Sequence, residues 1–578
     1  MRIASVLLTV CCCLSAASGQ WRQSRAALPD ERIAPSGAAV TDRLPAPGGE
    51  PFRAEVGTVD TIGGTTYDWQ FSGPVWRMLV NSAGHGIHAA WMYSASMSGS
   101  SFSDRNIRYN YYERASQQWV YADSTDYMYG GQSVFPKRAG YGSIDVDTSG
   151  TPFISCHATL GGASRPWVAR GDAGGYSDST GLPTCMWPPI AVGRNGAVHI
   201  FALTAAYELT YCHIAPDSWP IWSAPLTGIA PSPGFPTQNI AASKVSDKVS
   251  LVWEVDTSGD AYQMHSTDGG VTWGSPTPLD PPDAYGGDTL TSYGITSLFP
   301  FYDRHDRLHI VANLSPVVND IALVVPSQIW HYCPDNTPQW SRIHVAGCDP
   351  ANMKGSVGFN ATYACRPSIG EDPAGGLYVV WEQFDSLNVD TTTSRLRADI
   401  FYSKDNGDNG ASWLTGARIT DQGTWSCRFP SALDYLEDDT FRVSYMIDQQ
   451  AGAFAGPSPE GAATRNPVVV RKVATSVEIA EGRGPAVPSV GLSAAPNPFG
   501  GVTAISYQLG RDGPVALTMR DVTGRAVRLL ACGPQPVGLH SVVWDGKDDG
   551  GRVLPAGVYF CTLSASSERL SMKLVLTE

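Results

Sequence analysis

Three arginines recur at matching places along the chain and carry a side chain suited to binding a carboxylate. Arg77 lies in the segment VWRMLV, Arg366 in CRPSIGED and Arg428 in CRFPSALD. A guanidinium group stays charged and can bind a carboxylate through two parallel hydrogen bonds. If the three segments converge, these arginines could clamp one acidic ligand. The alternative is that they line a channel and pair with Asp or Glu residues of neighbouring segments.

Two glutamates follow tryptophans in similar apolar runs, Glu254 in LVWE and Glu382 in VVWE. Glycoside hydrolysis uses a carboxylic acid with a second carboxylate, or in some enzymes with a tyrosine nucleophile. Tyr293, Tyr435 and Tyr445 are available for the tyrosine role. The alternative is that both glutamates are solvated ends of strands.

The elements that would position these side chains repeat along the middle of the chain. Seven apolar, strand-like runs follow short polar turns: IHAAW (87–91), PFISC (152–156), VHIFA (198–202), VSLVW (249–253), LHIVA (308–312), LYVVW (377–381) and FRVSY (441–445). A repeat of roughly 45 to 70 residues made of short strands and turns is typical of a β-propeller. We expect four strands in each unit and a working surface at the mouth of the central channel.

Two turns within these units share the pattern S-x-D-x-G-x-x-W, the second with three inserted residues. Its fixed positions are Ser266, Asp268, Gly270 and Trp273 in the first turn, and Ser403, Asp405, Gly410 and Trp413 in the second. The Asp can accept N–H groups of its own turn, Gly supplies a left-handed residue and Trp packs beneath. We expect both turns to be structural.

These turns resemble the Asp-box of sialidase-like propellers, and the resemblance covers roughly residues 55–475. It implies that the boxes lie on the rim, away from the active site. Sialidases also clamp a sugar carboxylate with three arginines from separate blades, a role that would fall to Arg77, Arg366 and Arg428. The family has six blades and an R-I-P motif, whereas this chain has seven runs and Arg77-Met78-Leu79.

Toward the end of the chain, strands and turns follow one another at a different spacing. These strands of five to eight residues predict a small β-sandwich. It resembles the type IX secretion C-terminal sorting domain and the Ig-like domain of flagellar hook-cap proteins. The matching segments include PNPF (496–499), DVTGR (521–525), WDG (544–546), GVY (557–559) and KLVL (573–576). The resemblance implies delivery by the secretion machinery. The acidic turn at 545–549 lacks the spacing of a calcium loop, so we expect a hairpin turn there.

The start of the chain reads as a targeting segment. Residues 1–19 combine Arg2, a short apolar core and small residues before Gln20, as a secretory signal peptide does. Residues 20–52 predict a flexible lead-in and residues 476–490 a linker. We find no transmembrane segment in the sequence, because no run approaches the roughly 20 apolar residues that a bilayer needs.

Composition narrows the choice of partner. The chain has 578 residues, with 40 Lys and Arg against 54 Asp and Glu, so its formal net charge is −14. An acidic chain without a basic stripe repels phosphate backbones, so we do not expect this protein to bind nucleic acid. The C-x₂-C spacing of zinc sites is missing, and we expect neither a metal nor a cofactor.

We therefore predict an all-β chain, with a β-propeller at 53–475 and an Ig-like β-sandwich at 491–578. Seven blades are preferred and six are the alternative. The last unit lacks a fourth strand, and a strand within 53–72 would complete it. We expect a secreted or surface-held protein that binds a glycan or a cell-surface protein without catalysis. The alternatives are an exo-acting, sialidase-type glycosidase and a purely architectural propeller with a plugged, apolar channel.

Overall fold

The computed structural model describes residues 57–577 with gaps, and the chain divides into two compact units, Met1–Glu478 and Ile479–Glu578. Each unit is described by itself. The gaps are 99–101, 161–162, 173–174, 180–183, 256–258, 282–291, 319–320, 323, 349–352, 359, 421–422, 456–458, 475–489, 496, 498, 510–512, 536–537 and 566–567. The expected signal peptide, the lead-in and most of the expected linker lie outside the described residues.

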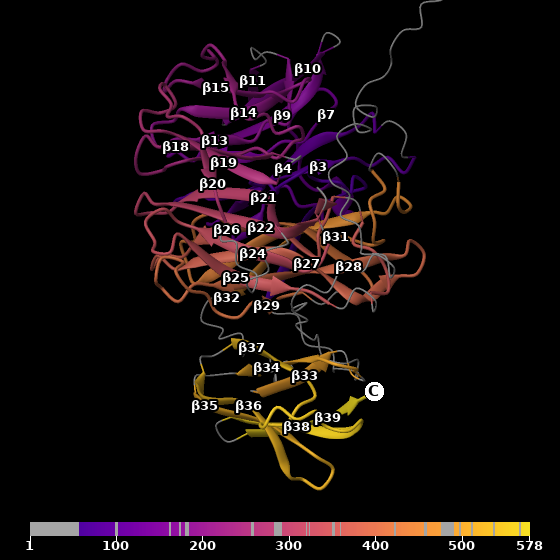
Figure 1. The fold of residues 1–578 in the computed structure, drawn as a ribbon. Coiled ribbons are helices and arrows are strands. Elements are labelled where there is room, and N and C mark those ends of the chain that lie inside the picture. Colours follow the sequence, from indigo (N-terminus) through magenta and orange to yellow (C-terminus); the bar gives the residue numbers. More distant parts are fainter. Residues whose placement is uncertain are drawn as a thin grey trace, which may run out of the picture. The chain divides into compact units, whose positions relative to one another are not determined.

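The described strands of the first unit form seven antiparallel sheets (Figure 1). The first three comprise β2 (Leu79–Ser82), β3 (Gly86–Tyr93), β4 (Asn106–Glu113), β5 (Gln118–Trp119) and β6 (Gln132–Ser133); β7 (Ala139–Gly140), β8 (Ile144–Val146), β9 (Pro152–Leu160), β10 (Ala163–Asp172) and β11 (Gly175–Ser179); and β12 (Cys185–Met186), β13 (Ile190–Val192), β14 (Val198–Thr204), β15 (Leu209–Ile214) and β16 (Leu226–Ile229).

The other four sheets comprise β17 (Asn239–Ala242), β18 (Val249–Val255), β19 (Asp260–Ser266) and β20 (Thr277–Leu279); β21 (Ser292–Tyr302), β22 (Leu308–Val318), β23 (Ile321–Ala322), β24 (Ser327–Tyr332) and β25 (Trp340–Ala346); β26 (Ala364–Glu371), β27 (Leu377–Asp390), β28 (Arg395–Lys404) and β29 (Ala417–Arg418); and β30 (Ser426–Ala432), β31 (Thr440–Asp448), β32 (Asn466–Ala474) and β1 (Thr58–Thr65).

The predicted all-β propeller is confirmed, with seven blades. Each of the seven apolar runs lies in the second strand of a sheet, from β3 in the first to β31 in the last. These strands are buried on both faces because neighbouring sheets cover them, so they read as continuous apolar runs. Within the described residues, the 3-10 helix η2 (Tyr127–Tyr129) is the one helical element, and no helix there has the length and apolar character needed to cross a membrane.

The N-terminal strand closes the ring, as the sequence predicted. β1 pairs antiparallel with β32, from Thr58 opposite Lys472 to Thr65 opposite Asn466. The last sheet also joins the first through the Met78 N–H, which donates to Ser431 Oγ at 3.0 Å. Two strands of the last sheet, contributed by opposite ends of the propeller segment, therefore hold the circle together.

Residues 67–78, which we call the plug, fill the centre of the ring between β1 and β2. The plug has no strand partner, so side chains of other sheets satisfy its backbone. The Nδ2 groups of Asn239 and Asn360 donate to the carbonyl oxygens of Val75 and Ser72, each at 3.1 Å. In return, the Trp76 indole N–H donates to the Gln238 carbonyl at 3.1 Å.

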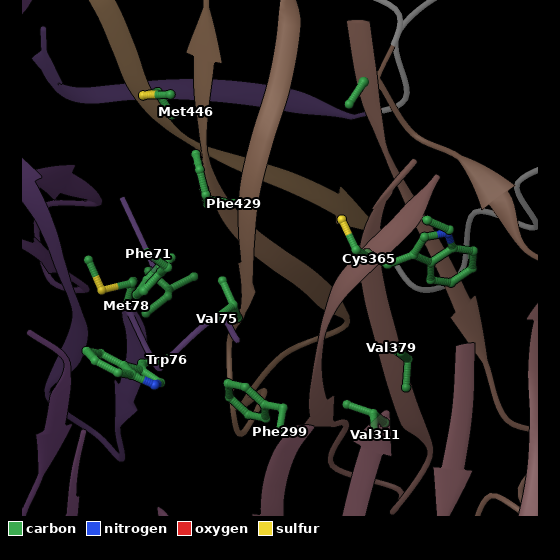
Figure 2. Close-up of a cluster of buried hydrophobic side chains, with 14 of the residues drawn as sticks. Phe71, Val75, Trp76, Met78, Phe299, Val311, Cys365, Val379, Phe429 and Met446 are labelled. Atoms are coloured by element: carbon green, nitrogen blue, oxygen red, sulfur yellow. The ribbon is translucent and has the colours of Figure 1, made fainter. Parts of the chain in front are cut away.

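The plug makes the axis of the propeller apolar at its centre. In Figure 2, Phe71, Val75, Trp76 and Met78 share one buried cluster with side chains of later sheets, Phe299 and Phe429 among them. The rings of Phe71 and Phe429 lie 6.0 Å apart. The structure thus has the filled, apolar channel that an architectural propeller would have, and any ligand must be held nearer to one of the two ends.

Three histidines occupy equivalent positions in three blades and are packed. His88, His199 and His309 lie in the second strands β3, β14 and β22 and are buried. The Nδ1 atoms of His88 and His199 each lie 2.8 Å from a tyrosine hydroxyl of the third strand, and His309 Nδ1 lies 2.9 Å from His331 Nε2. These contacts tie the second strand to the third and account for the repeated histidine.

The second unit is a β-sandwich, as predicted. One sheet has β33 (Val490–Ala495), β34 (Thr503–Leu509) and β37 (Gly538–Trp544), and the other β36 (Ala526–Gln535), β35 (Gly513–Arg520), β38 (Gly557–Ala565) and β39 (Glu568–Leu576). Phe499, Trp544 and Tyr559 pack between them. Asp548 accepts the N–H groups of Gly550 and Arg552 at 2.9 Å, so this carboxylate serves its own turn.

Candidate functional site

One end of the propeller carries four of the five arginines and glutamates proposed from the sequence. The innermost strands β7, β12, β17, β26 and β30 all begin at this end, which we call the mouth face. Because the second strand of each sheet runs antiparallel to the first, the second strands end at the same face. Arg366 and Arg428 lie near the starts of β26 and β30, Glu254 near the end of β18, and Glu382 in β27 opposite Cys365.

Three partly exposed aromatic residues, Tyr141, Trp187 and Tyr207, lie at the mouth face and are called the aromatic group below. Their φ angles are 52°, 51° and 61°, in the left-handed region that bulky residues rarely adopt. The rings of Trp187 and Tyr207 stack with centroids 6.1 Å apart. Such conformations persist only where the surroundings fix them, and they cluster at binding and active sites.

A buried network of phenols, a guanidinium and an imidazole supports the aromatic group. The hydroxyls of Tyr67 and Tyr141 lie 2.9 Å apart, and Arg105 Nη1 donates to Tyr67 at 3.1 Å. His157 stacks on Tyr141 at 5.4 Å, and its Nδ1 accepts the Trp187 N–H at 3.1 Å. Burial raises the pKa of Tyr141, whereas burial and the Arg105 charge lower the pKa of His157. Tyr141 and His157 are therefore neutral hydrogen-bonding groups near pH 7.

Two of the predicted arginines meet on one glutamate. Arg366 Nη1 binds Glu382 Oε1, and Arg428 Nε lies 3.3 Å from Glu382 Oε2, which also accepts the Phe429 N–H at 2.7 Å. All three charged side chains are buried. Burial alone would raise the pKa of Glu382, but Arg428, Arg366 and the Phe429 N–H lower it to about 2. Glu382 is therefore the carboxylate that this arginine pair holds.

Matching β-bulges aim the two arginines inward. The pairing of β26 with β27 shifts between Cys365 and Ser368, and that of β30 with β31 shifts between Arg428 and Ser431. Arg366 has φ 56° and Phe429 has φ 60°, and each precedes a proline. A bulge adds a residue to one strand and re-aims its side chain, which explains the repeated Cys-Arg sequence in neighbouring blades.

Arg77 does not join the other two arginines. Its Nη1 lies 3.6 Å from Asp145 and 3.6 Å from Asp434, which follows the far end of β30. Lys244, just beyond β17, lies 3.0 Å from Asp145. The three arginines thus pair with Asp and Glu residues, the alternative raised from the sequence, and they do not form one clamp.

The expectation that the two glutamates are solvated is wrong. Glu254 is 4% exposed and Glu382 fully buried. Glu382 can be buried because two guanidinium groups compensate its charge. Of the candidate tyrosines, Tyr435 donates to the Tyr302 carbonyl at the opposite end and Tyr445 accepts from Arg471, so neither is bonded to a predicted glutamate. The side chain of Tyr293 lies outside the described residues.

Asp68 of the plug and Asp448 at the end of β31 form a buried acidic pair. Asp68 accepts the N–H groups of Phe454 and Ala455 at 2.6 and 2.8 Å. Burial nevertheless raises the pKa of Asp68 to about 6, and burial with the Asp68 charge raises the pKa of Asp448. The folded protein therefore holds protons here that the unfolded chain has released.

This pair gives a prediction for pH. Between about pH 4, the ordinary aspartate value, and about pH 6, this pair binds more protons in the folded state than in the unfolded state, so its contribution to the free energy of unfolding should fall as pH rises. Asp448→Asn should make that fall shallower, because it removes the charge facing Asp68. Denaturant unfolding at several pH values measures both slopes. The exposed control Asp335→Asn should keep the original slope, and an unchanged slope in Asp448→Asn would refute the assignment.

The two S-x-D-x-G-x-x-W turns lie at the opposite face, where the third strands end. Asp268 Oδ1 accepts the N–H groups of Val271 and Thr272 at 3.1 and 2.8 Å, and the Trp273 indole donates to the Gly270 carbonyl at 3.1 Å. Gly270 has φ 83°, and a Cβ there would meet the Tyr211 hydroxyl at 1.7 Å. Only glycine fits this approach.

In the second turn the aspartate equivalent to Asp268 is Asp408, which corrects the assignment of Asp405. Asp408 accepts the Ser412 N–H at 3.0 Å and its hydroxyl at 2.5 Å, as Asp268 does with Thr272. The three inserted residues push Asp405 inward, where it accepts the N–H groups of Leu377 and Gly410 at 2.9 and 3.1 Å. Ser403 donates to the Leu414 carbonyl, and Trp413 to Gly410, so the rest of the turn is as predicted.

From these contacts we expect alanine substitutions of the three turn aspartates to lower stability by different amounts and to leave ligand binding unchanged. Asp405→Ala should cost about 1–3 kcal/mol, because it leaves buried N–H groups without an acceptor. Asp268→Ala and Asp408→Ala should lower the melting temperature less, because their carboxylates are exposed. Thermal melts paired with a ligand-binding assay separate the effects. If Asp268→Ala lost binding at an unchanged melting temperature, this turn would belong to the binding site.

A group that could hold a cation lies at the opposite face and was not predicted. One ligand atom each from Asp303, His305 and Glu371 lies within 4.8 Å of the others. Arg307 Nε is 2.7 Å from Asp303, and Arg304 Nη1 is 3.4 Å from Glu371. Because two guanidinium groups already balance the two carboxylates, these residues are better suited to an ion-pair network than to a metal.

Comparison with known proteins gives a match at the C-terminal unit. Residues 497–569 match the model of the FlgD Ig-like domain. The basal-body rod modification protein FlgD of Salmonella typhimurium is 40% identical over 53 residues, as is the same protein of Salmonella typhi. The matched part is 9% of this chain and 23% of each relative, so the chain spans about a quarter of their length.

Solved structures similar to this chain are distant. A PL25 polysaccharide lyase, an ulvan lyase, is 13% identical with a TM-score of 0.42, covering 68% of this chain and 97% of its own. The NanB sialidase of Streptococcus pneumoniae is 11% identical, with a TM-score of 0.37 and coverage of 72% and 70%. PorZ of Porphyromonas gingivalis, a type IX secretion surface component, is 12% identical, with a TM-score of 0.28 and coverage of 86% and 69%.

The sequence did not single out the aromatic group or its supporting network. Tyr141, Trp187 and Arg105 lie between strands with no motif around them, and their backbone conformation is set by packing. One signal was available. Tyr67-Asp68-Trp69 interrupts the repeat between β1 and β2, and a polar, aromatic segment without strand alternation within a propeller points to a special role.

Proposed function

We propose that the propeller binds a glycan at the mouth face without catalysis. The observation that supports this is the aromatic group, Tyr141, Trp187 and Tyr207, held partly exposed in strained conformations. Aromatic rings offer flat apolar surface against which the C–H face of a sugar can pack, with polar groups nearby for its hydroxyls. Because the plug fills the centre of the ring, a ligand cannot occupy a channel through it, and we place the ligand at the mouth face.

The sialidase-type reaction is the weaker candidate. A carboxylate clamp needs arginines whose charge is free to meet the ligand, yet Arg366 and Arg428 are buried on Glu382 and Arg77 binds Asp145 and Asp434. A fluorogenic sialoside assay on the full chain tests this directly. We expect no turnover above that of a heat-denatured control, and turnover lost in Arg428→Lys would reverse the ranking.

The aromatic group gives the test of binding. Trp187→Ala should weaken binding of the strongest oligosaccharide on a glycan array about tenfold or more, since aromatic anchors dominate such interfaces. Trp273→Ala is the matched control, because Trp273 is also a partly exposed tryptophan but lies at the opposite face. Equal affinity of the two variants would refute the placement of the ligand. A protein ligand in place of a glycan would appear as an array without a hit.

For the C-terminal unit, we propose delivery to the cell surface by the type IX secretion machinery, after signal-peptide export. The support is the sequence resemblance of residues 491–578 and their separate sandwich core. Deleting 491–578 should retain an intact propeller in the periplasm. Surface labelling and fractionation of cells measure this, and a truncated protein that still reaches the surface would contradict the proposal.

A further inference from the structure

A small polar hollow lies at the mouth face between the plug and two blades. Gly73 of the plug forms one side, the bulge of β21 at Ser297 a second, and Asn360 with Arg366 of β26 a third. The hollow has room for about one water-sized group. Because its walls come from three separate segments, it exists only once the ring has closed around the plug.

Three polar atoms around this hollow have no hydrogen-bond partner within the described part of the chain. They are Ser297 Oγ, Asn360 Oδ1 and Arg366 Nε. Their residues are 4%, 9% and 2% exposed. Buried polar atoms are nearly always hydrogen-bonded, so three such atoms at one hollow indicate a group that normally sits among them.

Hydrogen bonds already hold the other polar atoms of Asn360 and Arg366. Asn360 Nδ2 donates to the Ser72 carbonyl at 3.1 Å, which leaves its Oδ1 without a partner. Arg366 Nη1 binds Glu382 and Nη2 binds the Asn360 carbonyl, whereas Nε has no partner among the described residues. Asn360 and Arg366 both have positive φ, 53° and 56°, and the site is therefore built before any ligand arrives.

The pattern of donors and acceptors fits a hydroxyl, that of a sugar or of a water molecule, better than an acid. Arg366 Nε–H can only donate, Asn360 Oδ1 can only accept, and the Ser297 hydroxyl can do either. A hydroxyl accepts from the first and donates to the second, whereas a carboxylate would meet the Asn360 oxygen with a second acceptor. Glu382 also neutralises the Arg366 charge that would attract an acid.

We infer that this hollow holds one hydroxyl of a neutral sugar and makes the propeller select neutral over acidic glycans. The inference rests on the proposed glycan-binding function and names the substrate class of the same face. It also places the decisive contact on Ser297, Asn360 and Arg366, at the same face as the aromatic group.

The test uses the full chain on an array of neutral, uronate-bearing and sialylated oligosaccharides, followed by calorimetry with the strongest neutral hit. We expect neutral glycans to bind and Ser297→Ala to weaken that binding about five- to tenfold, the value of one hydrogen bond. Ser315→Ala is the matched control. Its Oγ is equally buried and unpartnered among the described residues, yet Ser315 does not line the hollow, so affinity should not change.

The remaining outcomes separate the two proposals. Binding of sialylated or uronate-bearing glycans in preference to neutral ones overturns this inference and leaves glycan binding standing. Neutral binding that Ser297→Ala and the space-filling Ser297→Val leave unchanged also overturns it, since the hollow would then hold only a structural water. An array without any hit removes the proposed function itself. A melting temperature equal to that of the parent chain confirms that each variant is folded.

Discussion

Glu382→Ala should lower the free energy of unfolding of the propeller by about 3–5 kcal/mol, the cost of leaving buried charges uncompensated. Glu382 is fully buried and faces Arg366 and Arg428, which are themselves buried. Without the carboxylate, two guanidinium groups face each other away from water, and the Phe429 N–H loses its acceptor. Denaturant unfolding followed by tryptophan fluorescence measures the loss.

Two further variants show that the loss is electrostatic. Glu382→Gln keeps the volume but removes the charge, so it should lose most of the same stability. Asp247→Asn breaks the exposed pair between Asp247 and Arg194, whose nitrogen lies 3.0 Å from the carboxylate, and should cause no measurable change because water screens that pair. If Glu382→Gln proved as stable as the parent chain, packing alone would account for the burial of Glu382.

Trp76→Ala should cost about 3–5 kcal/mol, because it opens a cavity at the axis of the propeller. Trp76 is 2% exposed, packs edge-to-face on Phe71 at 5.9 Å and donates its indole N–H to the Gln238 carbonyl. The loss should appear as a lower melting temperature. Trp425→Ala, at a side chain that is 41% exposed, should leave the melting temperature unchanged. An equally stable Trp76→Ala would mean that the plug is dispensable to the fold.

Much of the propeller could be predicted from sequence, because its second strands are buried on both faces and read as continuous apolar runs. The closing strand β1 was predictable from the number of strands in each unit, because the last unit lacked a fourth strand. The plug was not, because Phe71, Val75 and Trp76 show no strand alternation and their burial depends on a ring that forms around them. A local sequence pattern predicts local structure only. The plug could not be predicted in this way because side chains of other blades hold it in place.

The sequence predicted which residue types the candidate site contains, but it did not predict which of them pair with one another. The matched sequences around Arg366 and Arg428 placed both arginines correctly at strand starts, but the bulges that turn them onto Glu382 depend on left-handed residues that carry no sequence signal. Arg77 looked equivalent by position and pairs with Asp145 instead. In the second box turn, the spacing to the tryptophan would have identified Asp408, because Asp268 and Asp408 both lie five residues before it.

The closing pair of strands has a consequence for how this protein is made. β1 is the first strand to be synthesised, and β32, its partner, is the last of the ring. A chain stopped before β32 therefore carries a leading strand β1 without its partner, although residues that pack on the plug, such as Asn239, Phe299 and Phe429, have already been made. Such edges are templates for aggregation. We expect the ring to form late and in one step, after the whole propeller segment has emerged, so a holding factor that binds the leading segment would raise the yield more than one that binds any single blade.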